Sequence, residues 1–548
     1  MTAVSRWLAC LLALWLPGTA SADAPRTRLV HRGRPLAVRA IGKPWTQRKG
    51  HIELGGRPHT ITAGLRILPG DFHVKARLRI LDQKNSAASF FLGSSHFGFE
   101  GARGTLFLNG PLFGKAVRLL GPSTDSFNRG DWITLDVVRR GPVIDFRIDD
   151  KSIATARSEA GFDRFGFSPW RSTIQLAEFS IHGQVEPVKP AITLPTIDLD
   201  GHTHRQVTID REPGQYLGHP TTCLLEDGKT LLCVYPRGHG RGAVLYKRSR
   251  DGGKTWSRRL PTPASWATSK ETPTLHRVIG PDGKKRIIMW SGLYPARLAV
   301  SENDGASWSE LKPAGAWGGI VVMGALVPLR TGPGHYLAFF HDDGRFFTAG
   351  PRKRNPVVFT LYKTRSTDGG LTWSVPQPIL ARSDVHLCEP GVIRSPDGKQ
   401  LACLLRENSR RKNSHVIFSD NEGRSWSPPR ELPAALSGDR HTGKYGPDGR
   451  LLISFRDRPA RNVDTSSVGD WVAWVGRYED IVAGREGQYR VRLKDNTKGA
   501  DCAYPGVEVL PDGTFVLTTY GHWTTGEPPW ILGVRLKLEE LDHLTRQP

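Results

Sequence analysis

Cysteine is scarce in this chain, with 6 among 548 residues. No CxxC or HExxH motif occurs, so the common zinc-binding patterns are excluded, and we expect neither a metal nor an organic cofactor. Sustained helical periodicity is also absent after the N-terminus. Together, these absences favour a β-rich fold whose chemistry depends on ordinary side chains.

The apolar run at the N-terminus, residues 7–16, is too short to span a bilayer. It follows Arg6 and precedes small residues that end in Ala20-Ser21-Ala22. This pattern predicts a secretory signal over residues 1–22, hence a secreted or periplasmic protein without a transmembrane anchor after cleavage. Cys10 lies inside the run, but apolar residues continue past it, which disfavours a lipoprotein site.

Removal of the signal leaves an odd number of cysteines: Cys223, Cys233, Cys388, Cys403 and Cys502. At least one thiol is therefore free or pairs between chains. Cys223 and Cys233 flank a hairpin turn, where they either form a disulfide or serve as small buried apolar residues. The pairing and the oligomeric state stay open at this stage.

Acidic residues are also in deficit, with 53 Asp and Glu against 76 Lys and Arg and a formal net charge of +23. A strongly basic protein favours an anionic partner. The basic residues are scattered through both halves rather than gathered in one segment, so no nucleic-acid partner is expected. Export instead favours an acidic glycan or glycoconjugate.

Alternating apolar segments run from about residue 31 to 184, for example residues 72–80 and 132–138. Such period-two runs between Gly- and Asp-rich turns predict an antiparallel sandwich over residues 23–184. The stretch resembles a concanavalin-like or laminin-G-like jelly roll, a fold that often binds sugars and as often only packs. The Pro-rich residues 185–200 predict a semi-rigid linker.

Four copies of a turn, Ser-x-Asp/Asn-x-Gly-x-Thr/Ser-Trp, end at Trp256, Trp308, Trp373 and Trp426. Their spacing of roughly 50 to 65 residues is typical of propeller blades. Six Gly-containing hairpins then predict six blades within residues 201–548, at 217–262, 271–312, 319–378, 386–432, 438–493 and 501–540. The predicted fold is all-β: an N-terminal β-sandwich (jelly roll) followed by a six-bladed β-propeller.

The inner strands of a propeller converge, so residues at their ends can meet although they are distant in sequence. Glu389 opens blade four, Arg406 follows the hairpin of that blade, and Tyr504 opens blade six. With the repeated turns, this arrangement resembles the sialidase (neuraminidase) superfamily of propellers with Asp-box (BNR) repeats. The resemblance covers about residues 200–540.

The resemblance implies an exo-glycosidase that releases a terminal acidic sugar such as sialic acid with retention of configuration. Tyr504 would be the nucleophile and Glu389 its base, since a carboxylate nucleophile would be repelled by the carboxylate of the sugar. Arg406 would hold that carboxylate.

The chain departs from the family pattern in blade one, where His219 replaces the first carboxylate-binding Arg and the next loop has no Asp. His239 in that loop is the candidate general acid, because imidazole transfers protons near neutral pH. Asp342 or Asp343 is a rival acid. Other candidate substrate-binding residues are His219, Arg237, Arg297, Arg456 and Asp343, with Arg461 or Arg477 as alternatives to Arg456 for the third Arg of the family.

A second hypothesis from another class is a glycan-binding propeller that has lost catalysis and works with a lectin-like sandwich. Geometry separates the two hypotheses. An enzyme requires Tyr504 and Glu389 within hydrogen-bond reach beside a pocket lined by Arg406. A binding protein would tolerate apolar side chains at that centre.

Overall fold

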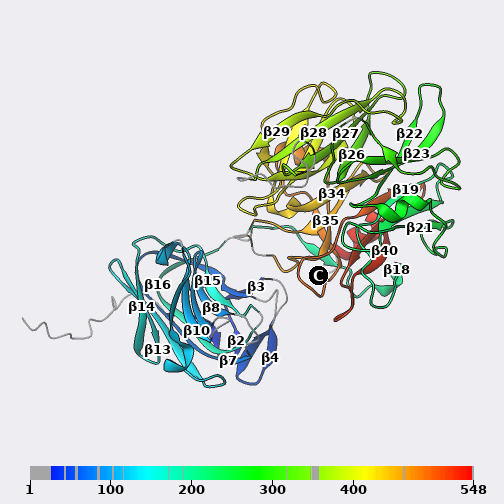
Figure 1. Ribbon diagram of the computed structural model, residues 1–548. Helices are drawn as coiled ribbons and strands as arrows, with labels where there is room; N and C mark the ends of the chain where they lie inside the picture. Colours follow the sequence, from blue (N-terminus) through cyan, green and yellow to red (C-terminus); the bar gives the residue numbers. More distant parts are fainter. Residues whose placement is uncertain are drawn as a thin grey trace, which may run out of the picture. The chain divides into compact units, whose positions relative to one another are not determined.

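The structure, a computed structural model, forms two compact units, residues 1–189 and 190–548 (Figure 1). The predicted signal, with Cys10, lies outside the residues that it describes. Those residues are 26–41, 45–55, 60–82, 87–100, 104–114, 116–170, 172–188, 191–315, 317–345, 347, 357–460, 463 and 465–545.

Two antiparallel sheets make up the first unit. One sheet has the strand order β14-β13-β12-β7-β16-β1-β2, and β5 joins it through β16 and carries β4. The other has the order β11-β10-β9-β8-β15-β6-β3. The strand bounds are β1 Arg26–His31, β2 Arg34–Pro35, β3 Val38–Ile41, β4 Thr46–Arg48, β5 His51–Gly55, β6 Thr60–Ala63, β7 Leu65–Asp82, β8 Ala88–Leu92, β9 Ser95–Glu100, β10 Thr105–Asn109, β11 Arg118–Pro122, β12 Ile133–Arg140, β13 Val143–Ile148, β14 Lys151–Arg157, β15 Phe165–Ser168 and β16 Thr173–Pro187.

The core of this unit lies between the two sheets. Val74 and Leu78 of β7 are buried in the same apolar cluster as Phe97 and Phe167 of the other sheet. The residues that alternate with them on β7, such as the exposed Lys75, point away from the core, because successive side chains of a strand face opposite sides. The predicted β-sandwich is therefore confirmed, while the jelly-roll subtype stays a prediction.

The predicted linker at residues 185–200 is shorter in the structure. Strand β16 continues to Pro187, and Val185 pairs with Ile67 of β7. At the other end, β17 (Thr196–Asp198) pairs in parallel with β37 of the second unit. Backbone pairing therefore extends into the predicted linker from both sides.

Six sheets form the second unit, a six-bladed β-propeller. The inner strands are β19 Thr221–Leu224, β22 Thr274–Ile279, β26 Met323–Pro328, β30 Leu387–Arg394, β34 Gly438–Tyr445 and β38 Gly506–Val509. The second strands are β20 Leu231–Pro236, β23 Lys285–Ser291, β27 Tyr336–Asp342, β31 Leu401–Glu407, β35 Leu451–Asp457 and β39 Phe515–Gly521. The third strands are β21 Val244–Ser249, β24 Arg297–Ser301, β28 Phe359–Ser366, β32 His415–Ser419, β36 Trp471–Gly476 and β40 Trp530–Leu536. Blades two to five add β25 Lys312–Pro313, β29 Gln377–Arg382, β33 Arg430–Glu431 and β37 Tyr489–Lys494.

The ring closes through a strand that precedes blade one. Strand β18 (Gln206–Asp210) pairs with β40 and becomes the outer strand of blade six. The predicted range 501–540 for blade six therefore lacks one strand, and blade one keeps three. Because blade six takes strands from both ends of the propeller, the edge of β40 is paired with β18 instead of being left open.

The repeated turns lie where the sequence predicts them. The six hairpins join the first and second strands of each blade, and their glycines, such as Gly228 and Gly513, have φ of 68° and 80°. The Asp-box turns follow the third strands. In the first of them, Asp251 accepts hydrogen bonds from the backbone N–H groups of Lys254 and Thr255 at 3.0 and 2.9 Å. This Asp therefore stabilises its own turn.

All five described cysteines are buried and free. Cys223 pairs across the hairpin with Leu232, and Cys233 pairs with Thr222. The two thiols are thus one register step apart and point to opposite faces of the sheet, which excludes a disulfide between them. They serve as small apolar residues.

Two short helices, α1 (Tyr478–Ala483) and α2 (Leu538–Thr545), accompany the propeller. Across the described residues, no helix combines the length and apolarity needed to cross a membrane.

Candidate active site

The inner strands start at one face of the ring, because every blade repeats the same path. Backbone distortions concentrate at these starts. His219, Glu389, Arg440 and Ala503 have positive φ values of 53°, 50°, 57° and 55°. Strands β30 and β34 also carry irregular registers, after Cys388 and after Asp439. Bulges and positive φ re-aim side chains, and here they turn polar groups toward a common centre.

Tyr504 and Glu389 meet at this centre. The Tyr504 hydroxyl donates a hydrogen bond to Oε1 of Glu389, and Nη1 of Arg406 binds the same oxygen at 2.6 Å. Arg406 Nη1 also lies 3.5 Å from the Tyr504 oxygen. The structure thus brings together three residues from blades four and six that the sequence analysis singled out.

The environment gives the phenol and the carboxylate opposite protonation states. Burial opposes ionisation of Glu389, but Arg406 and the Tyr504 hydroxyl outweigh it and hold the pKa of Glu389 below its ordinary value. Burial and the adjacent Glu389 charge raise the pKa of Tyr504 above its ordinary value. A neutral phenol therefore faces an ionised carboxylate, which accepts its hydrogen bond.

Asp439 holds a cluster of arginines beside this pair. Its carboxylate lies 2.5 Å from Nη2 of Arg410, 3.3 Å from Nε of Arg406 and 3.4 Å from Nη1 of Arg456. The side chain of Asp439 is 1% exposed. Burial opposes ionisation, yet the surrounding arginines hold the pKa of Asp439 below its ordinary range. Arg456 also lies 5.3 Å above the centre of the Tyr504 ring, a cation–π contact.

A cavity of about 470 Å³ opens over these arginines. Five cationic side chains and two carboxylates line it, a net charge of +3. Arg458 differs from the other arginines of the cavity because no ion pair joins its guanidinium to a carboxylate within the described structure. Burial and the charges of Arg410, Arg456 and Arg406 outweigh Asp439 and lower the pKa of Arg458 to about 10. An anion in the cavity would relieve this repulsion.

His219 and His239 lie on the blade-one side of Tyr504. The ring of His219 is 4.6 Å from that of Tyr504, and its Nδ1 accepts the N–H of Gly240 at 3.1 Å. Burial lowers the pKa of His219 well below its ordinary value, so the imidazole is neutral. His239 is 67% exposed at the rim, with Nδ1 2.7 Å from the Tyr216 hydroxyl.

The structure does not bring three predicted residues into this cluster. Arg237 pairs with Glu212. Arg297, at the start of a third strand, donates to the carbonyl of Thr268 at 2.7 Å. Asp343 is buried and binds Arg345 at 2.6 Å. Each of these side chains lies on a loop or an outer strand, where nearer partners than the axial cluster are in reach.

The structure also distinguishes between the candidates for the third arginine of the family. Arg456 contacts Asp439 and Tyr504, whereas Arg477 precedes α1 and its N–H binds Asp480 at 2.7 Å. Arg461 lies outside the described residues.

Sequence reasoning missed several residues of the site. Asp439 sits in blade five where Cys388 sits in blade four, one residue before the place of Glu389. Glu271 precedes the inner strand of blade two. The spacing from the hairpin that locates Glu389 and Tyr504 therefore finds neither of them. Asp501 is another residue of the site that the sequence did not predict. Burial opposes its ionisation, but hydrogen bonds from His239, His522 and Tyr216 hold its pKa below the ordinary range.

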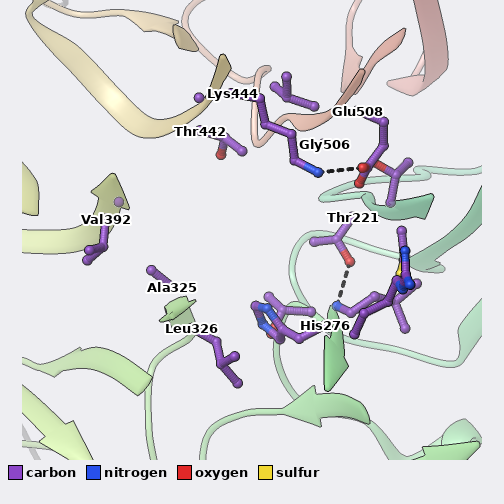
Figure 2. Close-up of a pocket in the computed structure, with 18 of the residues that line it drawn as sticks. Thr221, His276, Ala325, Leu326, Val392, Thr442, Lys444, Gly506 and Glu508 are labelled. Carbon is purple, nitrogen blue, oxygen red and sulfur yellow. Dashed lines mark hydrogen bonds and ion pairs between the residues drawn. The ribbon is translucent and has the colours of Figure 1, made fainter. Parts of the chain in front are cut away.

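A second and larger cavity, about 670 Å³, follows the axis between the inner strands (Figure 2). Two contacts join polar groups of its lining: Lys444 binds Glu508 at 2.6 Å, and Thr221 accepts the N–H of Leu275 at 3.1 Å. Ala325, Leu326 and Val392 supply apolar lining. Tyr504 and Glu389 line neither this cavity nor the cationic one; Arg406, which contacts both of them, lines the cationic cavity.

Among known protein families, residues 287–463 match the model of the BNR repeat-like domain, about a third of the chain. This region runs from blade two into blade five and contains three of the four Asp-box turns. No curated protein matches the sequence.

Solved structures resemble the chain at low identity. A protein of unknown function from Dyadobacter fermentans is 16% identical with a TM-score of 0.48, and the match covers 61% of this chain and 98% of that one. The leech intramolecular trans-sialidase is 12% identical with a TM-score of 0.42, covering 87% and 95%. The intramolecular trans-sialidase from Ruminococcus gnavus is 13% identical with a TM-score of 0.40, covering 61% and 96%. These values are too low for an activity to carry over. The repeats, the matched domain and the six blades identify the second unit as a six-bladed β-propeller with BNR repeats.

Proposed function

We propose that this protein is an exported exo-glycosidase that releases a terminal acidic sugar, sialic acid or a related sugar, from glycans. One observation supports this most strongly: a neutral tyrosine hydrogen-bonded to an ionised glutamate beside a cationic cavity. In the proposed reaction, Tyr504 attacks the anomeric carbon while Glu389 takes the phenol proton. Arginines of the cavity hold the carboxylate of the sugar.

A panel of aryl glycosides tests this function. Glycosides of sialic acid and of uronic acids are compared with those of the corresponding neutral sugars, and release of the phenol is followed by absorbance. We expect release from at least one acidic sugar and none from the neutral ones. A protein that binds acidic glycans but releases no product would support the glycan-binding alternative instead.

Substitution of Arg458 tests the recognition of charge. Since this guanidinium has no carboxylate partner, we expect Arg458→Ala to raise KM for the acidic glycoside by roughly 10- to 100-fold, the loss of about one charge-assisted hydrogen bond. Arg458→Lys should recover part of the loss because it restores the charge but not the fork of donors.

Arg297→Ala is the matched control for this substitution. It removes an arginine of the same propeller that binds Thr268 and does not reach the cavity, so KM should stay unchanged. An equal rise of KM in both variants would indicate a general electrostatic effect and contradict the role of Arg458.

A further inference from the structure

Glu271 is a second glutamate at the starts of the inner strands. It is half-buried and precedes β22, two residues after Ser269 and one before Thr272. Its Oε1 accepts the N–H of Thr272 at 2.8 Å and the hydroxyl of Thr272 at 3.0 Å. A Cβ added to Gly240 would lie 2.8 Å from that oxygen. The carboxyl group is therefore packed directly against the loop that carries His239.

Glu271 also lies within the electrostatic reach of the reactive pair. The charges that act on it are those of His239, from the loop after β20, and Glu389, from β30. Glu271 in turn acts on the buried Arg440 of β34. Arg440 donates its own hydrogen bonds to the carbonyl groups of Gly324 and Met323, at 2.9 and 3.2 Å. Among the described residues, no Lys or Arg forms an ion pair with Glu271.

The two glutamates therefore have opposite electrostatic surroundings. Glu389 is bound by Arg406 and stays ionised. Burial raises the pKa of Glu271 to about 7, with the charge of Glu389 adding to this effect and the Thr272 hydrogen bonds and His239 opposing it. A pair of carboxyl groups whose pKa values are driven apart in one site is the arrangement that assigns one as base and the other as acid.

We propose that Glu271 is the general acid of the reaction, a role that rests on the proposed function. Tyr504 forms the bond to the anomeric carbon and its proton moves to Glu389. The glycosidic C–O bond breaks as the carboxyl group of Glu271 gives its proton to the leaving oxygen, which departs as an alcohol. In the second step, water attacks the anomeric carbon and passes its proton to Glu271, while the Tyr504 oxygen leaves and recovers its proton from Glu389.

His239 is the rival donor, and the two residues predict different results. His239 is 67% exposed and lies 3.4 Å from Asp501, so it stands at the rim of the site. Glu271 packs against the same loop at Gly240. If His239 is the donor, His239→Asn will show the loss described below and Glu271→Gln will not.

The test is the dependence of the rate on the leaving group. The wild-type protein, Glu271→Gln and His239→Asn are assayed on one acidic sugar bearing an alkyl group, phenol or 2,4-dinitrophenol. We expect Glu271→Gln to lower kcat/KM roughly 100-fold or more for the alkyl glycoside, which needs protonation. It should lower kcat/KM less than about 10-fold for the dinitrophenyl glycoside, whose anion leaves without a proton. Glu302→Gln, a surface glutamate that pairs with Lys284 and Arg286, is the control and should match the wild type.

The pH profile gives a second readout. A donor must be protonated, so wild-type kcat/KM on the alkyl glycoside should fall as pH rises through about 7, the pKa of Glu271. This alkaline limb should disappear in Glu271→Gln. Circular dichroism and thermal melts verify that each variant is folded.

Three outcomes would overturn the inference. Equal losses on all three leaving groups would indicate a structural role for Glu271. An unchanged rate on the alkyl glycoside would remove it from the reaction. A wild-type protein that releases none of the sugars would contradict the proposed function itself. This outcome is distinct from the other two because it is seen in the wild type alone, without any variant.

Discussion

Tyr504→Phe should abolish release of the acidic sugar, with kcat falling roughly a thousandfold or more, because the variant has no oxygen to attack the anomeric carbon. The ring remains, so its contact with Arg456 and its packing beside His219 should persist. Release of phenol from the best acidic aryl glycoside measures the effect, with thermal denaturation verifying that the variant is folded.

Tyr445→Phe is the matched control. Tyr445 is also a tyrosine of the propeller, and its hydroxyl donates to the carbonyl of Arg394 at 2.8 Å, away from the reactive cluster. Its loss should leave kcat unchanged. Activity retained by Tyr504→Phe would refute the assignment of the nucleophile.

Asp439→Asn is expected to give the largest loss of stability. The substitution keeps the shape of the side chain but removes a buried charge that binds Arg406, Arg410 and Arg456. Breaking such a buried network costs about 3 to 5 kcal/mol, since the remaining charges are left uncompensated. Chemical denaturation followed by tryptophan fluorescence should show this decrease in the free energy of unfolding at pH 7.

The pH dependence has a definite sign. The pKa of Asp439 is lower in the folded protein than in the unfolded chain. Its contribution is therefore fully present above the unfolded pKa, about 3.9, and is lost as pH falls through the folded value. The stability difference between wild type and Asp439→Asn should be constant above about pH 4 and shrink below it.

Asp384→Asn provides the comparison for an exposed ion pair. Asp384 binds Arg382 at 2.7 Å, but both side chains are close to half exposed. Solvent screens such pairs, so this variant should lose far less stability than Asp439→Asn. Equal losses in the two variants would contradict the account of Asp439 as the charge that holds the arginine cluster.

Local sequence patterns were sufficient to predict the fold. The Asp-Gly hairpins and Asp-box turns depend on residues that are adjacent in the chain, so they located six blades correctly. The closing strand β18 escaped prediction because it carries neither turn and pairs with a strand more than 300 residues later. The same limit applies to β17, which joins blade five from the predicted linker.

The site was predicted only in part. Tyr504, Glu389 and Arg406 could be found because their positions relative to hairpins are regular. Asp439 and Glu271 are single acidic residues whose roles depend on burial and on the charges that surround them. Arg297 was instead predicted to bind substrate because it lies at the end of a strand. That strand is the third of its blade, and the side chain binds Thr268.

The most direct measurement is covalent trapping of the intermediate. A fluorinated acidic sugar with a good leaving group should slow both steps and leave the sugar attached to the enzyme, and peptide mass mapping should place it on Tyr504. Attachment to another residue, or release of a product of inverted configuration without any adduct, would contradict a tyrosine nucleophile.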